Sequence, residues 1–140
     1  MKKIYFAAVF IILLVAVLYS YSNNRKIPVS IAPISITGLW ADSNSAAFTN
    51  CYAIFSEKDG KVSFAHYLEF NGTGMVEEGK GTITGNKVQY DVIVTKAIPG
   101  WALAGTHSLT LSDDGKKLSG IFKDAKGNTG PIVFVKKSEP

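Results

Sequence analysis

Glycine-containing turn dipeptides divide most of this chain into short segments. Asp-Gly and Asn-Gly supply the positive φ angles that two-residue hairpin loops need, so they predict tight turns between antiparallel strands. Two longer connections, at residues 43–50 and 97–106, complete the series. The dipeptides are Asp59-Gly60, Asn71-Gly72, Gly85-Asn86, Asp114-Gly115 and Gly127-Asn128.

Seven connections predict eight strands, and the segments between them are rich in β-branched and aromatic residues. No segment after Ser35 has a 3.6-residue apolar period long enough for a helix. The pattern therefore predicts an all-β domain, an eight-stranded antiparallel up-and-down meander that closes into a barrel and so removes its two edges. We expect strands at 36–42, 51–57, 61–70, 74–84, 87–96, 107–112, 117–124 and 130–137.

The N-terminus carries a membrane-directed segment, residues 1–22, expected to form one hydrophobic helix. Lys2 and Lys3 precede a long apolar run, and with Tyr19 and Tyr21 the stretch reaches the length of a membrane span at residues 4–21. This favours an uncleaved signal-anchor. A signal peptide cleaved near Ser22 is the alternative, although Ser20 and Ser22 make only a poor small-residue cleavage site.

The domain organisation follows from this leader. Residues 23–34 contain two prolines and predict an extended linker, and residues 35–137 form the barrel domain. We expect a single-pass protein of the cell membrane with an extracytoplasmic barrel, or a secreted or periplasmic barrel if the leader is cleaved. No cysteine follows the apolar run at the position a lipoprotein anchor needs.

Charge and cysteine content exclude some functions. The chain has a formal charge of +4, but without Lys2 and Lys3 it has 13 basic and 11 acidic residues, well mixed. No basic stripe is present, so nucleic acid is not an expected partner. Cys51 is the single cysteine, so no internal disulfide staples the domain. We expect its thiol to be buried in the core.

The first expected strand contains Gly38-Leu39-Trp40, a G-x-W motif at the start of the meander. In this the chain resembles the calycin superfamily of lipocalins, avidins and fatty-acid-binding proteins. The resemblance covers residues 36–135 in architecture and Gly38 and Trp40 in motif. It implies that Trp40 is a structural plug at the closed end of the barrel. The second lipocalin motif, the long C-terminal helix and the biotin-binding residues of avidins have no counterparts, so no particular ligand is implied.

Connectivity indicates where a ligand would bind. Both long connections fall at the same end of an up-and-down barrel, which predicts a mouth there. His66 and His107 lie on inward-facing registers, Trp101 and Phe48 lie in the two long connections, and aromatic residues of the inner face would form apolar walls. Alternatively, His66 is an ordinary core histidine and Trp101 only caps the barrel. The candidate ligand-binding residues are Phe48, Phe64, His66, Tyr90, Trp101 and His107.

Catalytic and metal signatures are absent from the sequence. Two histidines without a nearby cysteine or a clear carboxylate partner do not predict a zinc site, and no cofactor is expected. The adjacent acidic pairs Glu77-Glu78 and Asp113-Asp114 place their side chains on opposite faces of a strand or in a turn. We interpret them as solvated charges, and no residue as catalytic.

Three functional hypotheses remain. The favoured one is a non-catalytic barrel that binds a small apolar or amphipathic ligand, or a protein partner. The first alternative is a small lipocalin-like enzyme, of isomerase or cyclase type, with His66 or His107 as the acid–base residue. The second is a secreted protein inhibitor that acts through the loop at residues 97–106. An empty volume inside the barrel would favour the first two over the third.

Overall fold

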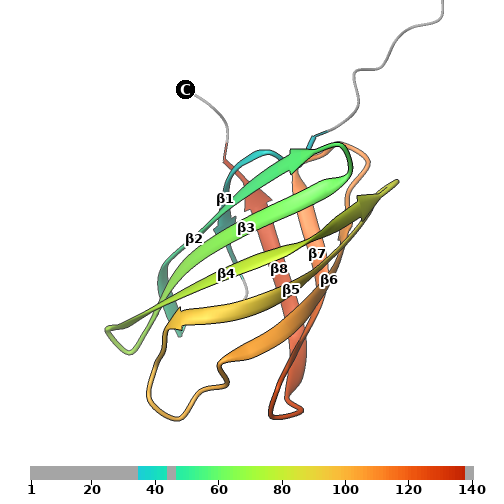
Figure 1. Cartoon of the computed structure of the whole chain (residues 1–140). Helices are drawn as coiled ribbons and strands as arrows, with labels where there is room; N and C mark the ends of the chain where they lie inside the picture. The colour runs from blue at the N-terminus through green and yellow to red at the C-terminus, as the bar shows by residue number, and fades with distance from the viewer. Residues whose placement is uncertain (1–34, 44–46, 138–140) are drawn as a thin grey trace, which may run out of the picture. The chain divides into compact units, whose positions relative to one another are not determined.

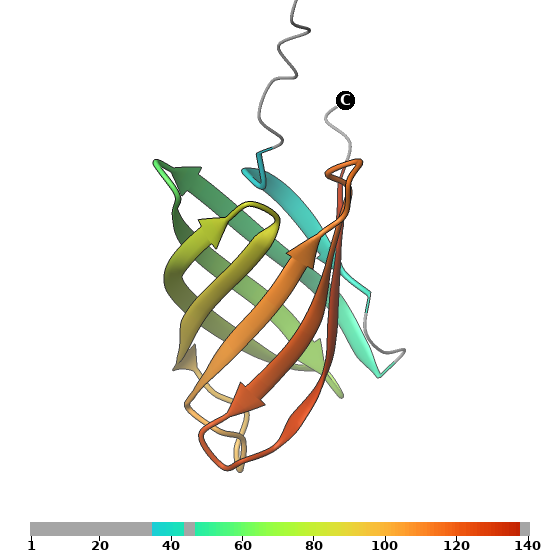
Figure 2. The same ribbon diagram turned by 90° about the vertical axis from the view of Figure 1, so that its right-hand side faces the viewer.

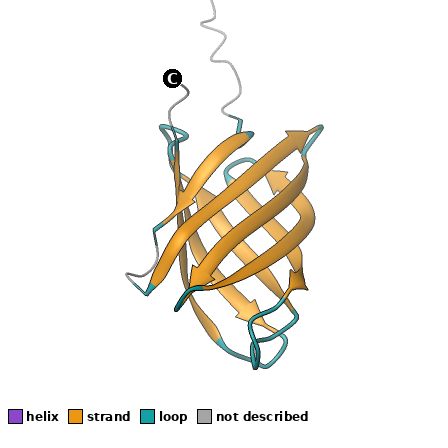
Figure 3. Cartoon of the chain, turned by 90° about the vertical axis from the view of Figure 1, so that its left-hand side faces the viewer, coloured by secondary structure: helices purple, strands orange, loops and turns teal. Residues whose placement is uncertain are grey.

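The computed structural model describes residues 35–43 and 47–137. They form eight antiparallel strands in up-and-down order, so the predicted all-β meander is confirmed (Figure 1). Every regular element among the described residues is a strand (Figure 3). The strands are β1 (Gly38–Asp42), β2 (Phe48–Lys58), β3 (Lys61–Phe70), β4 (Thr73–Thr84), β5 (Lys87–Lys96), β6 (Ala104–Leu111), β7 (Lys117–Asp124) and β8 (Thr129–Lys136).

The sheet closes on itself, as the sequence predicts. Each strand pairs with the next along the chain, and β1 also pairs with β8 (Figure 2). The closing contact is short: Trp40 lies opposite Lys136, Ala41 opposite Val135 and Asp42 opposite Phe134. Closure leaves no strand edge unpaired within the sheet, which removes the hazard of edge-to-edge association.

The hairpin turns have the backbone geometry that the dipeptides predict. Asp59 and Gly60, between β2 and β3, have φ angles of 54° and 74°. Asn71 and Gly72, between β3 and β4, have φ angles of 49° and 76°. Two successive positive φ angles match the right-handed twist of the flanking strands, so these turns fix the register of both hairpins.

Two strands, β2 and β6, begin three residues earlier than the sequence predicts. β2 begins at Phe48 because a bulge between Thr49 and Tyr52, with Asn50 at a φ of 49°, lets pairing with β3 continue past the irregularity. β6 begins at Ala104, so the long connection after β5 is residues 97–103 rather than 97–106. Phe48 therefore belongs to a strand and not to a loop.

The end of the barrel with the tight turns is filled by a large cluster, here called the closed-end cluster. Trp40 is fully buried in it, and its indole Nε1 donates a hydrogen bond of 2.8 Å to the carbonyl of Ile36. The ring of Phe55 meets that of Trp40 edge-on at 5.9 Å. The cluster consists of Ile36, Trp40, Ala53, Phe55, Val62, Phe64, Val88, Tyr90, Val92, Leu109, Leu111, Leu118, Ile132 and Phe134.

Glycine on an inward register makes room for this packing. Gly120 of β7 lies opposite Leu109 of β6. A Cβ atom there would lie 1.9 Å from the carbonyl oxygen of Ser108 and 2.9 Å from the Cα of Leu109. Because both contacts are with backbone atoms, neither can be relieved by turning a side chain. The close approach of β6 and β7 thus depends on glycine at this position.

The expected hydrophobic helix at residues 1–22 and the linker at 23–34 lie outside the described residues. Within the described part of the chain, there is no apolar helix of membrane-spanning length.

Trp40→Ala should cost about 3–5 kcal/mol of unfolding free energy, as for other buried large aromatic residues. Urea unfolding of the full-length chain measures this cost. Trp101→Ala is the matched control, because Trp101 is only half-buried, and its cost should be smaller. A loss below about 1 kcal/mol for Trp40→Ala would contradict a structural role for this tryptophan.

Gly120→Ala should destabilise the barrel by about 1–3 kcal/mol or more, because the added methyl group meets backbone of β6. Gly74→Ala is the control. There a Cβ atom would meet the hydroxyl of the exposed Tyr67 at 2.8 Å, and that side chain can turn away. Equal losses in urea unfolding for the two variants would contradict the close-approach argument.

Candidate ligand-binding cavity

A cavity of about 270 Å³ opens at the end of the barrel opposite Trp40. Its lining includes Phe48 at the start of β2, Trp101 in the connection after β5 and Asp124 at the end of β7, so it lies at the end at which the sequence predicts a mouth. Its walls are mostly apolar, and four polar side chains gather on its inner part: Asp42, His66, Glu77 and His107. The barrel is therefore filled in one half and hollow in the other.

Aromatic rings surround the mouth. Trp101, in the loop at residues 97–103, packs against Phe48 and Phe70 at centroid distances of 5.9 and 5.3 Å. The loop is held by a hydrogen bond of 2.6 Å from the Lys126 Nζ to the Gly100 carbonyl. These rings belong to the mouth cluster, which consists of Cys51, Leu68, Met75 and Ile98 with Phe48, Phe70, Val94 and Trp101 packed against them.

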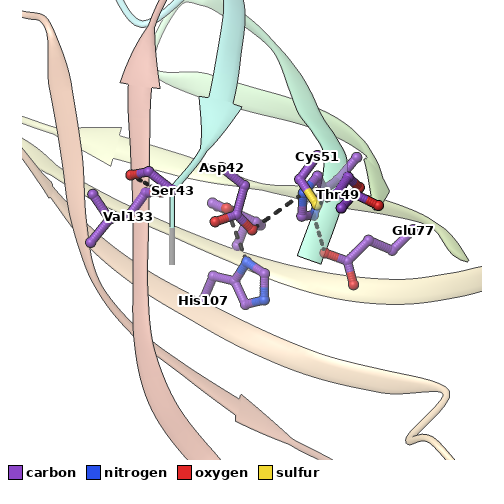
Figure 4. A network of polar contacts seen from close by, with 9 residues as sticks. Asp42, Ser43, Thr49, Cys51, Glu77, His107 and Val133 are labelled. Carbon is purple, nitrogen blue, oxygen red and sulfur yellow. Dashed lines mark hydrogen bonds and ion pairs between the residues drawn. The ribbon is translucent and has the colours of Figure 1, made fainter. Parts of the chain in front are cut away.

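His66 lies between the carboxylates of Asp42 and Glu77 in the polar part of the cavity. Figure 4 labels Asp42 and Glu77 together with His107. Nδ1 of His66 donates to Oε1 of Glu77 at 2.9 Å. Nε2 of His66 lies 3.5 Å from Oδ2 of Asp42 and has no hydrogen-bond partner in the part of the chain that the structure describes. The three side chains are 1%, 9% and 8% exposed, for His66, Glu77 and Asp42 respectively. This arrangement concentrates negative charge in a space shielded from water.

Glu77 and Asp42 are the site residues that the sequence analysis missed. The sequence predicts solvated charges at both Glu77 and Glu78. This is wrong for Glu77, which is buried, and Glu78 is exposed as expected. The signal was in the pattern: Glu77 shares an inward face with Met75 and lies opposite His66 in the β3–β4 register. Asp42 follows Trp40 by two residues and so points to the same side of β1.

A second buried pair joins β5 to β6. Nδ1 of His107 and the hydroxyl of Tyr90 are hydrogen-bonded at 3.0 Å. Burial lowers the pKa of His107 to about 4, so its ring is neutral at pH 7. Burial raises the pKa of Tyr90 well above its usual value, and the nearby charges of Glu77 and Asp42 add to this shift.

The predicted site residues separate into two groups. Phe48, His66, Trp101 and His107 line the cavity. Phe64 and Tyr90 lie below it in the closed-end cluster, where their rings stack at 4.7 Å. Phe64 also contacts both histidine rings, at 5.6 and 5.8 Å, so it supports the polar groups from beneath.

Cys51 lies in the mouth cluster with its thiol donating to the carbonyl of Thr49 at 3.0 Å. Burial raises its pKa, so the thiol is poorly suited to act as a nucleophile. Within residues 35–43 and 47–137, no group of three or more histidine, cysteine or carboxylate side chains has an arrangement suited to a metal ion.

Comparison with known proteins gives no family assignment. No protein-family model matches the chain, and searches of curated proteins and of solved structures found no match. The architecture, a closed eight-stranded antiparallel barrel, is consistent with that of the calycins.

His107 should make the fold sensitive to mild acid. Its pKa is about 4 in the folded chain and about 6.5 when unfolded, so the unfolded chain takes up the proton first as the pH falls. The resulting stability is fully present above pH 6.5 and is lost between pH 6.5 and 4, by up to about 3 kcal/mol. Urea unfolding of wild type and His107→Gln across this range measures the difference.

In that comparison, the contributions of surface carboxylates are common to both proteins and cancel. Stability of His107→Gln should fall less steeply with decreasing pH than that of wild type. Parallel curves for the two proteins would contradict a buried, neutral His107.

Proposed function

We propose that this chain is a non-catalytic, calycin-like binding protein whose barrel holds a small amphipathic ligand in the mouth cavity. We further propose that the barrel lies outside the cytoplasm, held at the membrane by the hydrophobic segment at residues 4–21. The support for this location is the pattern of the leader sequence alone.

The observation that carries the binding proposal is the internal cavity. Its volume of about 270 Å³ is near the lower end of the range found for small-molecule pockets, roughly 300–1,000 Å³. Apolar and aromatic walls with a few convergent polar groups are typical of such pockets. The walls would supply affinity through burial of apolar area, and the polar groups would orient the ligand.

The second candidate function is an enzyme. It is favoured by two buried pairs, His66–Glu77 and His107–Tyr90, in each of which a histidine that could act as an acid–base residue is hydrogen-bonded to a partner that orients it. The surroundings of His66 weigh against this. Its Nδ1 bonds to Glu77, and its Nε2 is buried and lies 3.5 Å from Oδ2 of Asp42. A general base needs a nitrogen that faces the substrate, so the geometry supports binding better than proton transfer.

Binding is measurable through Trp101, since the chain has two tryptophans and Trp40 lies at the far end. Titration of the full-length chain with alkyl and aromatic amines, alcohols and carboxylates should give a saturable fluorescence change with at least one class. Trp101→Phe should lose the optical signal but keep the heat of binding in calorimetry.

A variant that fills the cavity tests its location. Val94 lines the cavity and Ile93, its neighbour on β5, is exposed on the outer face. Val94→Phe should weaken binding at least about tenfold, which corresponds to about 1.4 kcal/mol, while Ile93→Phe should leave affinity unchanged. Absence of saturable binding with every class would overturn the proposal, as would equal effects of the two variants.

A further inference from the structure

We propose that the cavity selects a small ligand with a cationic, ammonium-type head, seated against the carboxylates of Asp42 and Glu77. This inference rests on the proposed binding function and specifies the class of ligand for the same cavity. The carboxylate of a fatty acid would be disfavoured there.

The formal charges inside the barrel support a cation. Asp42 and Glu77 together carry two negative charges, and His66 between them carries at most one positive charge. His107 is neutral at pH 7. The formal charges of the side chains at the inner part of the cavity therefore sum to a net negative value.

Lysine side chains do not change this balance. Lys123 is the one lysine among the described residues that line the cavity, and it lies at the rim with an exposed side chain. Asp124 beside it adds a further carboxylate at the mouth. The charges of Lys123 and Asp124 offset each other at the rim, so a cation entering the barrel meets net negative charge at the inner end, in surroundings where water screens charge weakly.

Hydrogen-bonding capacity also remains on Glu77. An ionised carboxylate offers about four acceptor positions, and among the described residues Glu77 accepts one hydrogen bond, from His66. Buried charged groups are costly unless they are paired and hydrogen-bonded, so a donor from a ligand would be favoured at this point. An ammonium group carries three N–H donors and no acceptor.

The remaining volume limits the rest of the ligand. At about 30 Å³ per water molecule in the liquid, 270 Å³ corresponds to roughly nine waters. The walls include the rings of Phe48, Trp101 and Phe122, which suit a compact apolar or aromatic body. A primary amine with one small ring meets both requirements, whereas a long acyl chain exceeds the space.

Three probes that share a phenyl body test the charge preference at pH 7: 2-phenylethylamine, 2-phenylethanol and 3-phenylpropanoate. Calorimetric titration of the full-length chain should show the amine binding at least about tenfold more tightly than the alcohol, as expected for charge-assisted hydrogen bonds. The propanoate should bind more weakly than either.

Glu77→Gln should abolish this preference by weakening the amine about tenfold while affinity for the alcohol stays within about twofold. Glu78→Gln is the matched control, because Glu78 is the next residue of β4 and is exposed on the outer face, and it should behave as wild type. Asp42→Asn is the second variant and should also weaken binding of the amine relative to the alcohol. The charge preference can then still be tested if Glu77→Gln does not fold.

Three other outcomes of these titrations would each contradict one part of the proposal. Equal or tighter binding of the alcohol or the propanoate would overturn the cationic head and leave the cavity as a binding site. An unchanged amine preference in both Glu77→Gln and Asp42→Asn would place the cation elsewhere and overturn this inference. No binding of these probes or of any compound in the wider panel would overturn the binding function itself.

Discussion

The short pairing of β1 with β8 closes the sheet, and both the packed core and the polar part of the cavity depend on it. It is made at Trp40, Ala41 and Asp42, opposite Lys136, Val135 and Phe134. The strand alternation turns Trp40 and Asp42 to the interior, so the residues that close the barrel also supply the aromatic plug and one of the carboxylates of the cavity. Stability and the character of the site are thereby built from the same five-residue strand.

The hollow half and the filled half differ in how closely their inward rings pack. Below the cavity, the rings of Phe55, Phe64, Tyr90 and Phe134 lie in a network of contacts at 4.7–6.0 Å. Near the mouth, the lining has Gly105 on the inward register of β6 between the rings of Phe48, Trp101 and Phe122, and the space among them is the cavity.

Strand order, turn positions and inward registers could be predicted from the sequence, because hairpins join neighbours in the chain and alternation has a fixed period. The polar part of the cavity could not be predicted from the sequence. Glu77 was judged by its residue type, yet its inward register opposite His66 decides its surroundings. Phe48 was assigned to a loop because the bulge at Asn50 interrupts the alternation that identifies a strand. Pairing between β1 and β8 is non-local and leaves no mark in a short window of sequence.

The bulge in β2 separates the two halves of that strand. Below it, Cys51, Ala53 and Phe55 face inward; above it, the extra residue shifts the phase so that Phe48 packs against the mouth cluster and Thr49 is exposed. Because Asn50 and Cys51 together oppose one residue of β3, removing Asn50 would restore regular alternation with Phe48 still inward and Thr49 still outward. The rim of this barrel can thus accept a single-residue change in length at the bulge while the mouth and the filled end keep the same inward side chains.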